Sequence, residues 1–375
     1  MASAIPFTFS KGDKDIRAMH SSTVIKAYNF LIWLTIQSPI LLLFYTMRYN
    51  PIDRNRKIYL ISAMTISCVL LIVTSFFSLV LQNKDCAGMS LIVIPVISII
   101  GFLGYTATQN VNDHDSADHE SYKPEREKAF KFATTIATMA ITVQTGMIYA
   151  SFNSPPLRAL QSFQSALSLF FLISMVGIFT MLATSIPLTV HYSFWRGIIL
   201  SFVRYSSAAI LVLLGLSAAA LAMQFLGILV AGVFLLVLAP ICVYFTQDRI
   251  GIGLIDPTSP RPLYHDPRSA GVIRDGFAIL ISINVALLAT ICVASVGDVP
   301  EHYYMSTGIR VWAFFQLLAI VSGLIWIGLM FEPQDGEQQH DEAWLSILEV
   351  FYYVSLLLQI FMIMAGTGML FLVPS

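Results

Sequence analysis

Long apolar segments alternate with short polar connections along almost the whole chain. Because roughly 20 consecutive apolar residues cross the hydrocarbon core of a bilayer, this pattern predicts about ten membrane spans. The segments lack the apolar–polar alternation of barrel strands, and backbone in lipid must satisfy its own hydrogen bonds, so each should be an α-helix. The predicted fold is an all-α, polytopic bundle of transmembrane helices. We expect the spans at residues 24–47, 58–81, 87–107, 129–151, 160–190, 198–222, 224–245, 273–297, 309–331 and 344–371.

The same pattern predicts a simple domain organisation. Residues 1–23 form a polar N-terminal tail, and residues 24–375 form one multi-pass membrane domain with no separate soluble domain. One boundary inside that domain is weakly marked. Around Met223 and Gln224, about 40 apolar residues continue with almost no polar break, which is long enough for two spans. We expect two helices joined there by a very tight turn.

Composition agrees with a protein that is embedded in a membrane. Of the 375 residues, 57% are hydrophobic and only 11% are charged, more apolar surface than a soluble domain of this length could bury. The net charge of -1 gives no indication of a nucleic-acid partner. Three of the four cysteines, Cys68, Cys242 and Cys292, fall inside predicted spans and only Cys86 lies in a connection, so no disulfide framework is expected.

Basic residues indicate the orientation of the spans. The odd-numbered connections carry roughly twice as many Lys and Arg residues as the opposite side, so they should face the cytoplasm and both termini should face away from it. The four basic residues of the N-terminal tail oppose this assignment. Beside the second span, we expect Arg54, Arg56 and Lys57 to contact anionic lipid headgroups, at about 1 kcal/mol each.

Uncharged amides are the main polar groups near the middle of the predicted spans. They occur in the first, fourth, eighth, ninth and tenth spans, as Gln37, Gln144, Asn284, Gln316 and Gln359. Amides both donate and accept hydrogen bonds, so several of them around one cavity would bind a polar uncharged or zwitterionic solute. The alternative is structural, because such side chains also hydrogen-bond between neighbouring helices.

Charged groups inside the spans are rare, which draws attention to Arg204 and Glu349. Each lies five or six residues into its span from the cytoplasmic side, roughly 8 Å deep at 1.5 Å per residue, so the two could form an intramembrane ion pair. Alternatively, each side chain reaches the headgroups and is hydrated by itself.

Histidines and acids gather in the predicted cytoplasmic connections. Imidazole and carboxylate groups are ligands for zinc, manganese or iron, and a shared site would use His114, His119, His265 and His340. However, the spacing of His114 and His119 does not place both rings on one helical face, and the stretch around them is rich in loop-forming Asp, Asn and Ser. A solvated connection is therefore the simpler interpretation of these residues.

These features favour a carrier or facilitator for a small polar solute. The alternatives are a non-catalytic membrane scaffold or regulatory subunit, and a membrane-embedded metal-dependent enzyme that uses the cytoplasmic His and Asp residues. The sequence contains no phosphate-binding loop, dinucleotide fingerprint, HExxH, CxxC or GxSxG motif, so no cofactor is expected and enzymatic activity is disfavoured. The expected partners are the lipid bilayer and a small-molecule solute.

Overall fold

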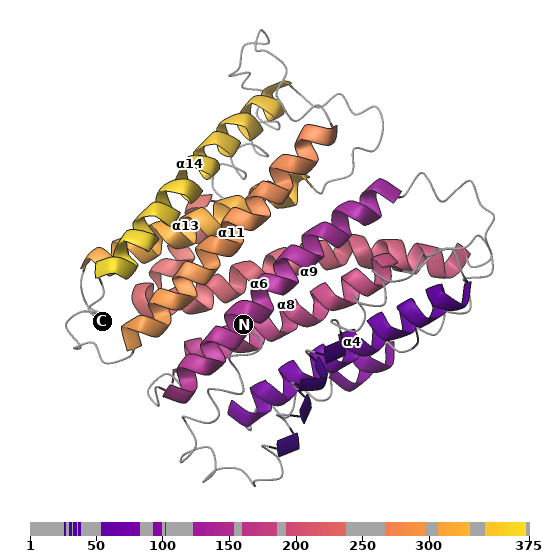
Figure 1. The fold of residues 1–375 in the computed structure, drawn as a ribbon. Helices are drawn as coiled ribbons and strands as arrows, with labels where there is room; N and C mark the ends of the chain where they lie inside the picture. Colours follow the sequence, from indigo (N-terminus) through magenta and orange to yellow (C-terminus); the bar gives the residue numbers. More distant parts are fainter. Residues whose placement is uncertain are drawn as a thin grey trace. The chain divides into compact units, whose positions relative to one another are not determined.

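The structure is a computed structural model of the full chain. The structure describes residues 26–27, 30–31, 33–35, 37–38, 54–82, 93–99, 102, 123–153, 160–185, 193–237, 267–296, 307–330 and 342–372. Almost all of these residues are helical and none of them lies in a strand, which confirms the all-α prediction for this part of the chain. The long helices, shown in Figure 1, are α4 (Arg54–Gln82), α6 (Lys123–Asn153), α8 (Gln161–Ser185), α9 (Ser193–Leu226), α11 (Pro267–Val296), α13 (Thr307–Met330) and α14 (Glu342–Leu372).

Five of the described helices are long and apolar enough to cross a membrane. Their apolar segments are Gln161–Thr184, Tyr205–Leu226, Ile273–Ala294, Thr307–Gly328 and Phe351–Gly368. The apolar part of α4, Ile61–Phe77, is shorter, and the threonine-rich α6 is not among the five. The chain therefore has the helices of a multi-pass membrane protein, but the predicted number of about ten spans is not confirmed. Most of the predicted spans at 24–47 and 87–107, and residues 238–245 of the predicted span at 224–245, lie outside the described residues.

The chain divides into two compact units. The first comprises Met1–Arg158 and Leu167–Ile210, and the second comprises Ala159–Ala166 and Leu211–Ser375. Both α8 and α9 therefore contribute residues to each unit.

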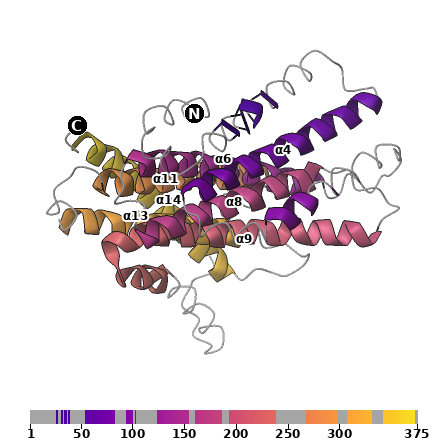
Figure 2. The same ribbon diagram turned by 90° about the horizontal axis from the view of Figure 1, so that it is seen from below.

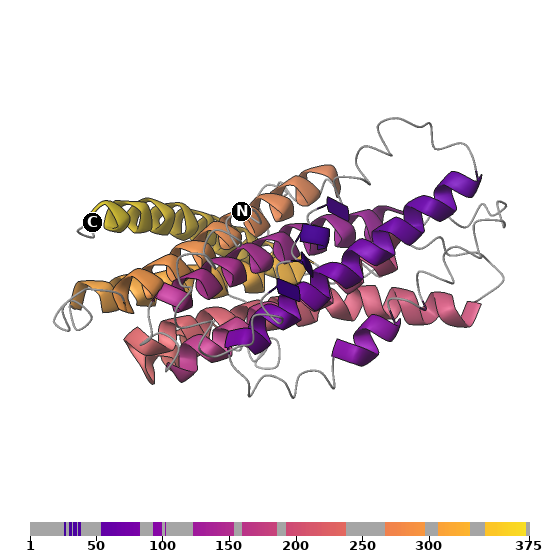
Figure 3. The ribbon, with the colours of Figure 1, turned by 60° about the horizontal axis from the view of Figure 1, so that its bottom comes forward.

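In the first unit, α8 contacts three other helices. Its Phe171 lies 6.2 Å, between ring centroids, from Phe76 of α4, and its Phe179 meets Phe202 of α9 edge-to-face at 4.4 Å. On α6 the contact is so close that a Cβ built on Gly177 would lie 2.7 Å from the Cβ of Ala137. Small residues allow this close approach of two helix backbones, which is typical of packing in lipid. Figures 2 and 3 show α4, α6 and α8 from two further directions.

The second unit contains α11, α13, α14 and the end of α9. Phe277 of α11 lies against Trp326 of α13 at 4.6 Å and Tyr352 of α14 at 5.6 Å. About three to four turns along the helices, a Cβ built on Gly366 of α14 would lie 3.1 Å from Leu287 of α11 and 3.4 Å from Trp312 of α13. Residue numbers thus rise together in α11 and α14 and fall in α13. Consecutive spans that cross a membrane in turn have this up–down–up arrangement.

A tight turn ends α9, close to where the sequence predicts one. The amide of Gly227 donates to the carbonyl of Met223 at 2.9 Å, and the chain becomes helical again at residues 229–237. Gly227 has φ 54°, a left-handed conformation that costs a residue with a side chain roughly 1–2 kcal/mol. The turn therefore lies at the glycine, a few residues beyond Met223 and Gln224.

Candidate functional site

Three of the five predicted mid-span amides meet inside the second unit. Asn284 of α11, Gln316 of α13 and Gln359 of α14 are each 0% exposed, and each lies near the middle of its apolar segment. Each residue is on the inward face of its helix, with residues one or two turns away along that face also buried, such as Ile281 on α11 and Ser355 on α14. The three amides therefore lie at a similar depth, because each is near the middle of its apolar segment. They meet because the inward faces of the three helices pack together.

The three amides form a continuous chain of hydrogen bonds, which we call the amide ring. Gln316 Nε2 donates to Asn284 Oδ1 at 2.7 Å and to the Asn284 carbonyl at 2.9 Å. Asn284 Nδ2 in turn donates to Gln359 Oε1, and Gln359 Nε2 donates to the carbonyl of Ala319. Gln316 and Ala319 are both on α13, so the series of hydrogen bonds begins and ends on α13 and passes through α11 and α14. One amide from each helix therefore links all three.

Gly323 provides the space in which the Gln359 amide lies. A Cβ built on this glycine would lie 2.5 Å from Gln359 Nε2 and 2.9 Å from two carbons of Ile281. Both distances are too short for carbon, so any side chain at residue 323 would displace its neighbours. The backbone of α13 must therefore approach α11 and α14 closely for the amide ring to form.

Several buried polar atoms near the ring have no hydrogen-bond partner among the described residues. On α13 they are Gln316 Oε1 and Trp312 Nε1, and on α14 the hydroxyl of Ser355. Buried polar groups in proteins are nearly always paired with protein, water or ligand, because an unpaired one costs about 1–3 kcal/mol. The second unit thus combines a bonded amide ring with neighbouring groups whose hydrogen-bonding capacity is free.

The other two predicted amides lie in the first unit. Gln144 of α6 is 2% exposed, and neither its Nε2 nor its Oε1 has a hydrogen-bond partner in the part of the chain that the structure describes. Gln37 is helical and half-buried. A role of the five amides in binding a solute stays a prediction.

The remaining candidate residues are described only in part. Arg54, Arg56, Lys57, Arg204 and Glu349 lie on helices, but their side chains are outside what the structure describes. His114, His119, His265 and His340 lie outside the described residues altogether. Within the described ranges, no three His, Cys, Asp or Glu residues are placed to hold a metal ion.

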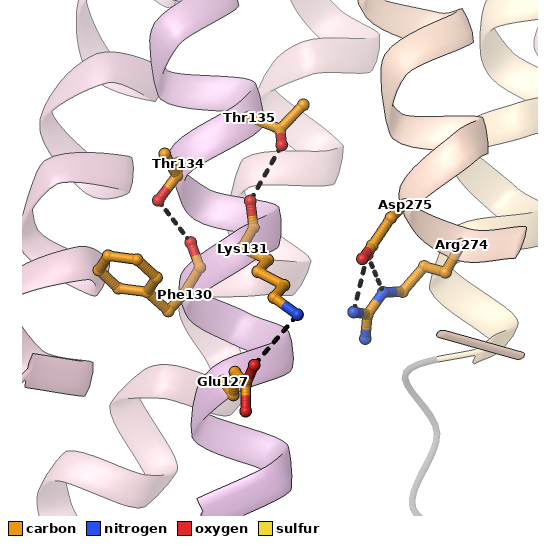
Figure 4. A network of polar contacts seen from close by, with 7 residues as sticks. All are labelled: Glu127, Phe130, Lys131, Thr134, Thr135, Arg274 and Asp275. Atoms are coloured by element: carbon orange, nitrogen blue, oxygen red, sulfur yellow. Dashed lines mark hydrogen bonds and ion pairs between the residues drawn. The ribbon is translucent and has the colours of Figure 1, made fainter. Parts of the chain in front are cut away.

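A buried arginine on α11 was not predicted from the sequence. Arg274 is 5% exposed and donates from Nε and Nη2 to Oδ1 of the adjacent Asp275, at 3.2 and 2.9 Å (Figure 4). Arg274 lies at the edge of the predicted span at 273–297, whereas α11 already begins at Pro267 and continues through it. An Arg–Asp pair directly before a long apolar run was the available signal. Figure 4 also shows the exposed pair of Glu127 and Lys131, 3.1 Å apart on α6, which such exposure makes nearly neutral for stability.

Comparison of the whole chain with protein-family models, with curated proteins and with solved structures finds no match. The class of the protein therefore follows from its helices alone, and they define an integral, multi-pass α-helical membrane protein.

Proposed function

We propose that this protein is a carrier or facilitator for a small polar solute, uncharged or zwitterionic, with the mid-span amides as its binding groups. The observation that carries the proposal is the presence of unpaired polar atoms at Gln144 and Gln316, both buried within long helices. A group that is costly to leave unpaired is well explained if water or solute reaches it during the working cycle. The scarcity of formal charge along the helices also suits a solute without net charge.

A membrane scaffold is the second candidate, and the amide ring favours it. The hydrogen bonds of the ring join α11, α13 and α14 directly to one another, as amides that hold helices together would do. A scaffold needs no access to the bilayer centre, whereas a carrier does. Movement of solute across the membrane therefore separates the two candidates.

The proposed topology has the odd-numbered connections in the cytoplasm. Arg54, Arg56 and Lys57 would then contact anionic lipids of the inner leaflet, as positively charged residues beside a span commonly do. Both termini would face the opposite side.

Gln144→Leu should lower solute flux without lowering the thermal stability of the protein. Leucine removes an amide that makes no hydrogen bond within the described residues, so the thermal stability of the variant should equal or exceed that of wild type. If the amide binds solute, flux of glycerol, urea or glycine betaine into proteoliposomes should fall about tenfold for the loss of one polar contact. Flux is measured by light scattering after an osmotic step. The control is Gln161→Leu, which makes the same change at an exposed position and is measured in the same way.

Three outcomes of this experiment are informative. Lower flux in Gln144→Leu with normal flux in Gln161→Leu supports the carrier proposal. Equal flux in both variants excludes Gln144 from the pathway. If wild-type protein moves none of the solutes faster than protein-free liposomes do, the carrier proposal fails and the scaffold remains.

A further inference from the structure

Two unpaired polar atoms lie one helical turn apart on the inward face of α13. Trp312 is 6% exposed and Gln316 is 0% exposed, and neither the indole Nε1–H nor Gln316 Oε1 has a partner among the residues that the structure describes. Side chains four residues apart on a helix are neighbours, with Cβ atoms about 6 Å apart. The indole N–H donates hydrogen bonds but cannot accept them, and the amide oxygen accepts hydrogen bonds but cannot donate them. Together they are a buried donor–acceptor pair.

The amide ring holds the acceptor of this pair in position. Gln316 Nε2 is already bonded to two oxygens of Asn284, which fixes the plane of the amide and leaves Oε1 as its free atom. The indole of the donor lies close to the backbone of α14, since a Cβ built on Gly366 would lie 3.4 Å from its Cζ2. Both groups are therefore held by contacts with neighbouring helices.

The central parts of the three helices that form the amide ring carry no formal charge. Residues 276–296, 311–330 and 350–371, the central parts of the three helices, contain no Asp, Glu, Lys, Arg or His. An ion or a zwitterion placed there would lose its hydration without gaining a counter-charge, which costs far more than burying a hydroxyl or amide group that finds its hydrogen bonds. The chemistry of the pair thus suits a neutral ligand that accepts one hydrogen bond and donates another.

We propose that Trp312 and Gln316 bind one hydroxyl or amide group of a small neutral solute. The indole Nε1–H donates to the oxygen of the solute, and Gln316 Oε1 accepts from its O–H or N–H. This inference rests on the proposed carrier function. It narrows the class of solute, because it excludes zwitterions and keeps only solutes that carry no formal charge, which we call neutral. A polyol such as glycerol and an amide such as urea are the matching probes.

The test compares two tryptophan variants of the full-length protein in liposomes. Trp312→Phe keeps an aromatic ring and removes the N–H. Trp326→Phe makes the same change at another buried position of α13, 1% exposed, where the indole stacks on Phe277. We expect Trp312→Phe to lower glycerol or urea flux at least fivefold and Trp326→Phe to change it less than twofold. Glycine betaine should cross no faster than in protein-free liposomes.

Different failures point to different parts of the argument. If glycerol or urea flux persists unchanged in Trp312→Phe, the pair is not the binding site although the carrier function stands. If glycine betaine crosses faster than glycerol and urea, the proposal that the solute carries no formal charge is wrong. If the wild-type protein moves none of the three, the carrier function itself fails.

A measurement without transport covers the case in which Trp312→Phe does not fold. The wild-type protein is labelled with ¹⁵N-tryptophan and solubilised in detergent. The Trp312 indole resonance is identified as the one that remains whichever of the other four tryptophans is replaced by Phe. We expect glycerol to shift the Trp312 resonance in a saturable way and to leave that of Trp326 in place. Equal, linear shifts of both resonances would overturn the proposal.

Discussion

Asn284→Leu should destabilise the protein by about 2 kcal/mol, because Asn284 bonds to both other amides of the ring. Leucine has a similar volume but cannot accept from Gln316 or donate to Gln359, so Gln359 Oε1 would be left buried and unpaired. The free energy of unfolding is measured by denaturant titration in detergent micelles. Thr290→Val on the exposed face of α11 removes only a hydroxyl bonded to its own helix and should change stability by less than about 0.5 kcal/mol.

A double-mutant cycle tests whether the ring acts as a unit. Gln359→Leu removes the next link, including the bond to the carbonyl of Ala319. If Asn284 and Gln359 stabilise the protein through each other, the double variant should lose less stability than the two single losses combined, by about 1 kcal/mol. Additive losses, or an Asn284→Leu variant as stable as wild type, would show that the ring does not hold the helices together.

Gly323→Ala should cost about 1–3 kcal/mol through overpacking. The added methyl carbon would lie 2.5 Å from Gln359 Nε2 and 2.9 Å from Ile281, so α13 must move away or the Gln359 amide must turn and lose its bond to Ala319. Gly276→Ala on α11 is the matched control, since a Cβ there meets nothing within 4 Å. Alanine is the better helix former, so the control should be stabilised by about 0.5–1 kcal/mol.

The opposite signs of these two variants make the comparison decisive. Thermal unfolding of both proteins in the same detergent should give a lower midpoint than wild type for Gly323→Ala and a higher one for Gly276→Ala. If Gly323→Ala is as stable as Gly276→Ala, α13 does not approach its neighbours as closely as the structure describes.

The sequence was a good guide to where helices lie and which polar groups are deep. The spans expected at 273–297, 309–331 and 344–371 agree closely with the observed α11, α13 and α14, because each is a long apolar run between polar connections. The amides stood out because the apolar runs contain so few other polar groups. The tight turn was expected slightly early, since polar Gln224 suggested a break, whereas the chain turns at Gly227, where glycine permits a positive φ.

The meeting of the amides could not be predicted in the same way. A helix that is apolar on all sides gives little indication of its rotation about its own axis, so the face that Asn284 or Gln359 presents was not determined. Ala319 and Gly323 did carry a signal, because small residues four apart mark close helix contacts in membranes. Trp312 gave none, since a tryptophan in an apolar run is as often at the lipid boundary as in the core.

The central claim is that water or solute reaches the buried amides, and site-directed thiol labelling tests it most directly. Single cysteines replace Gln144, Gln316 or Gln359 in a protein lacking its four native cysteines, with Ser116 in the predicted connection at 108–128 as the accessible control. The proteoliposomes are exposed to a membrane-impermeant thiol reagent from each side. The carrier proposal predicts labelling at Gln144 and Gln316 from at least one side. Labelling of Ser116 alone would mean that the helix centres are dry, and would contradict the proposal in favour of a scaffold.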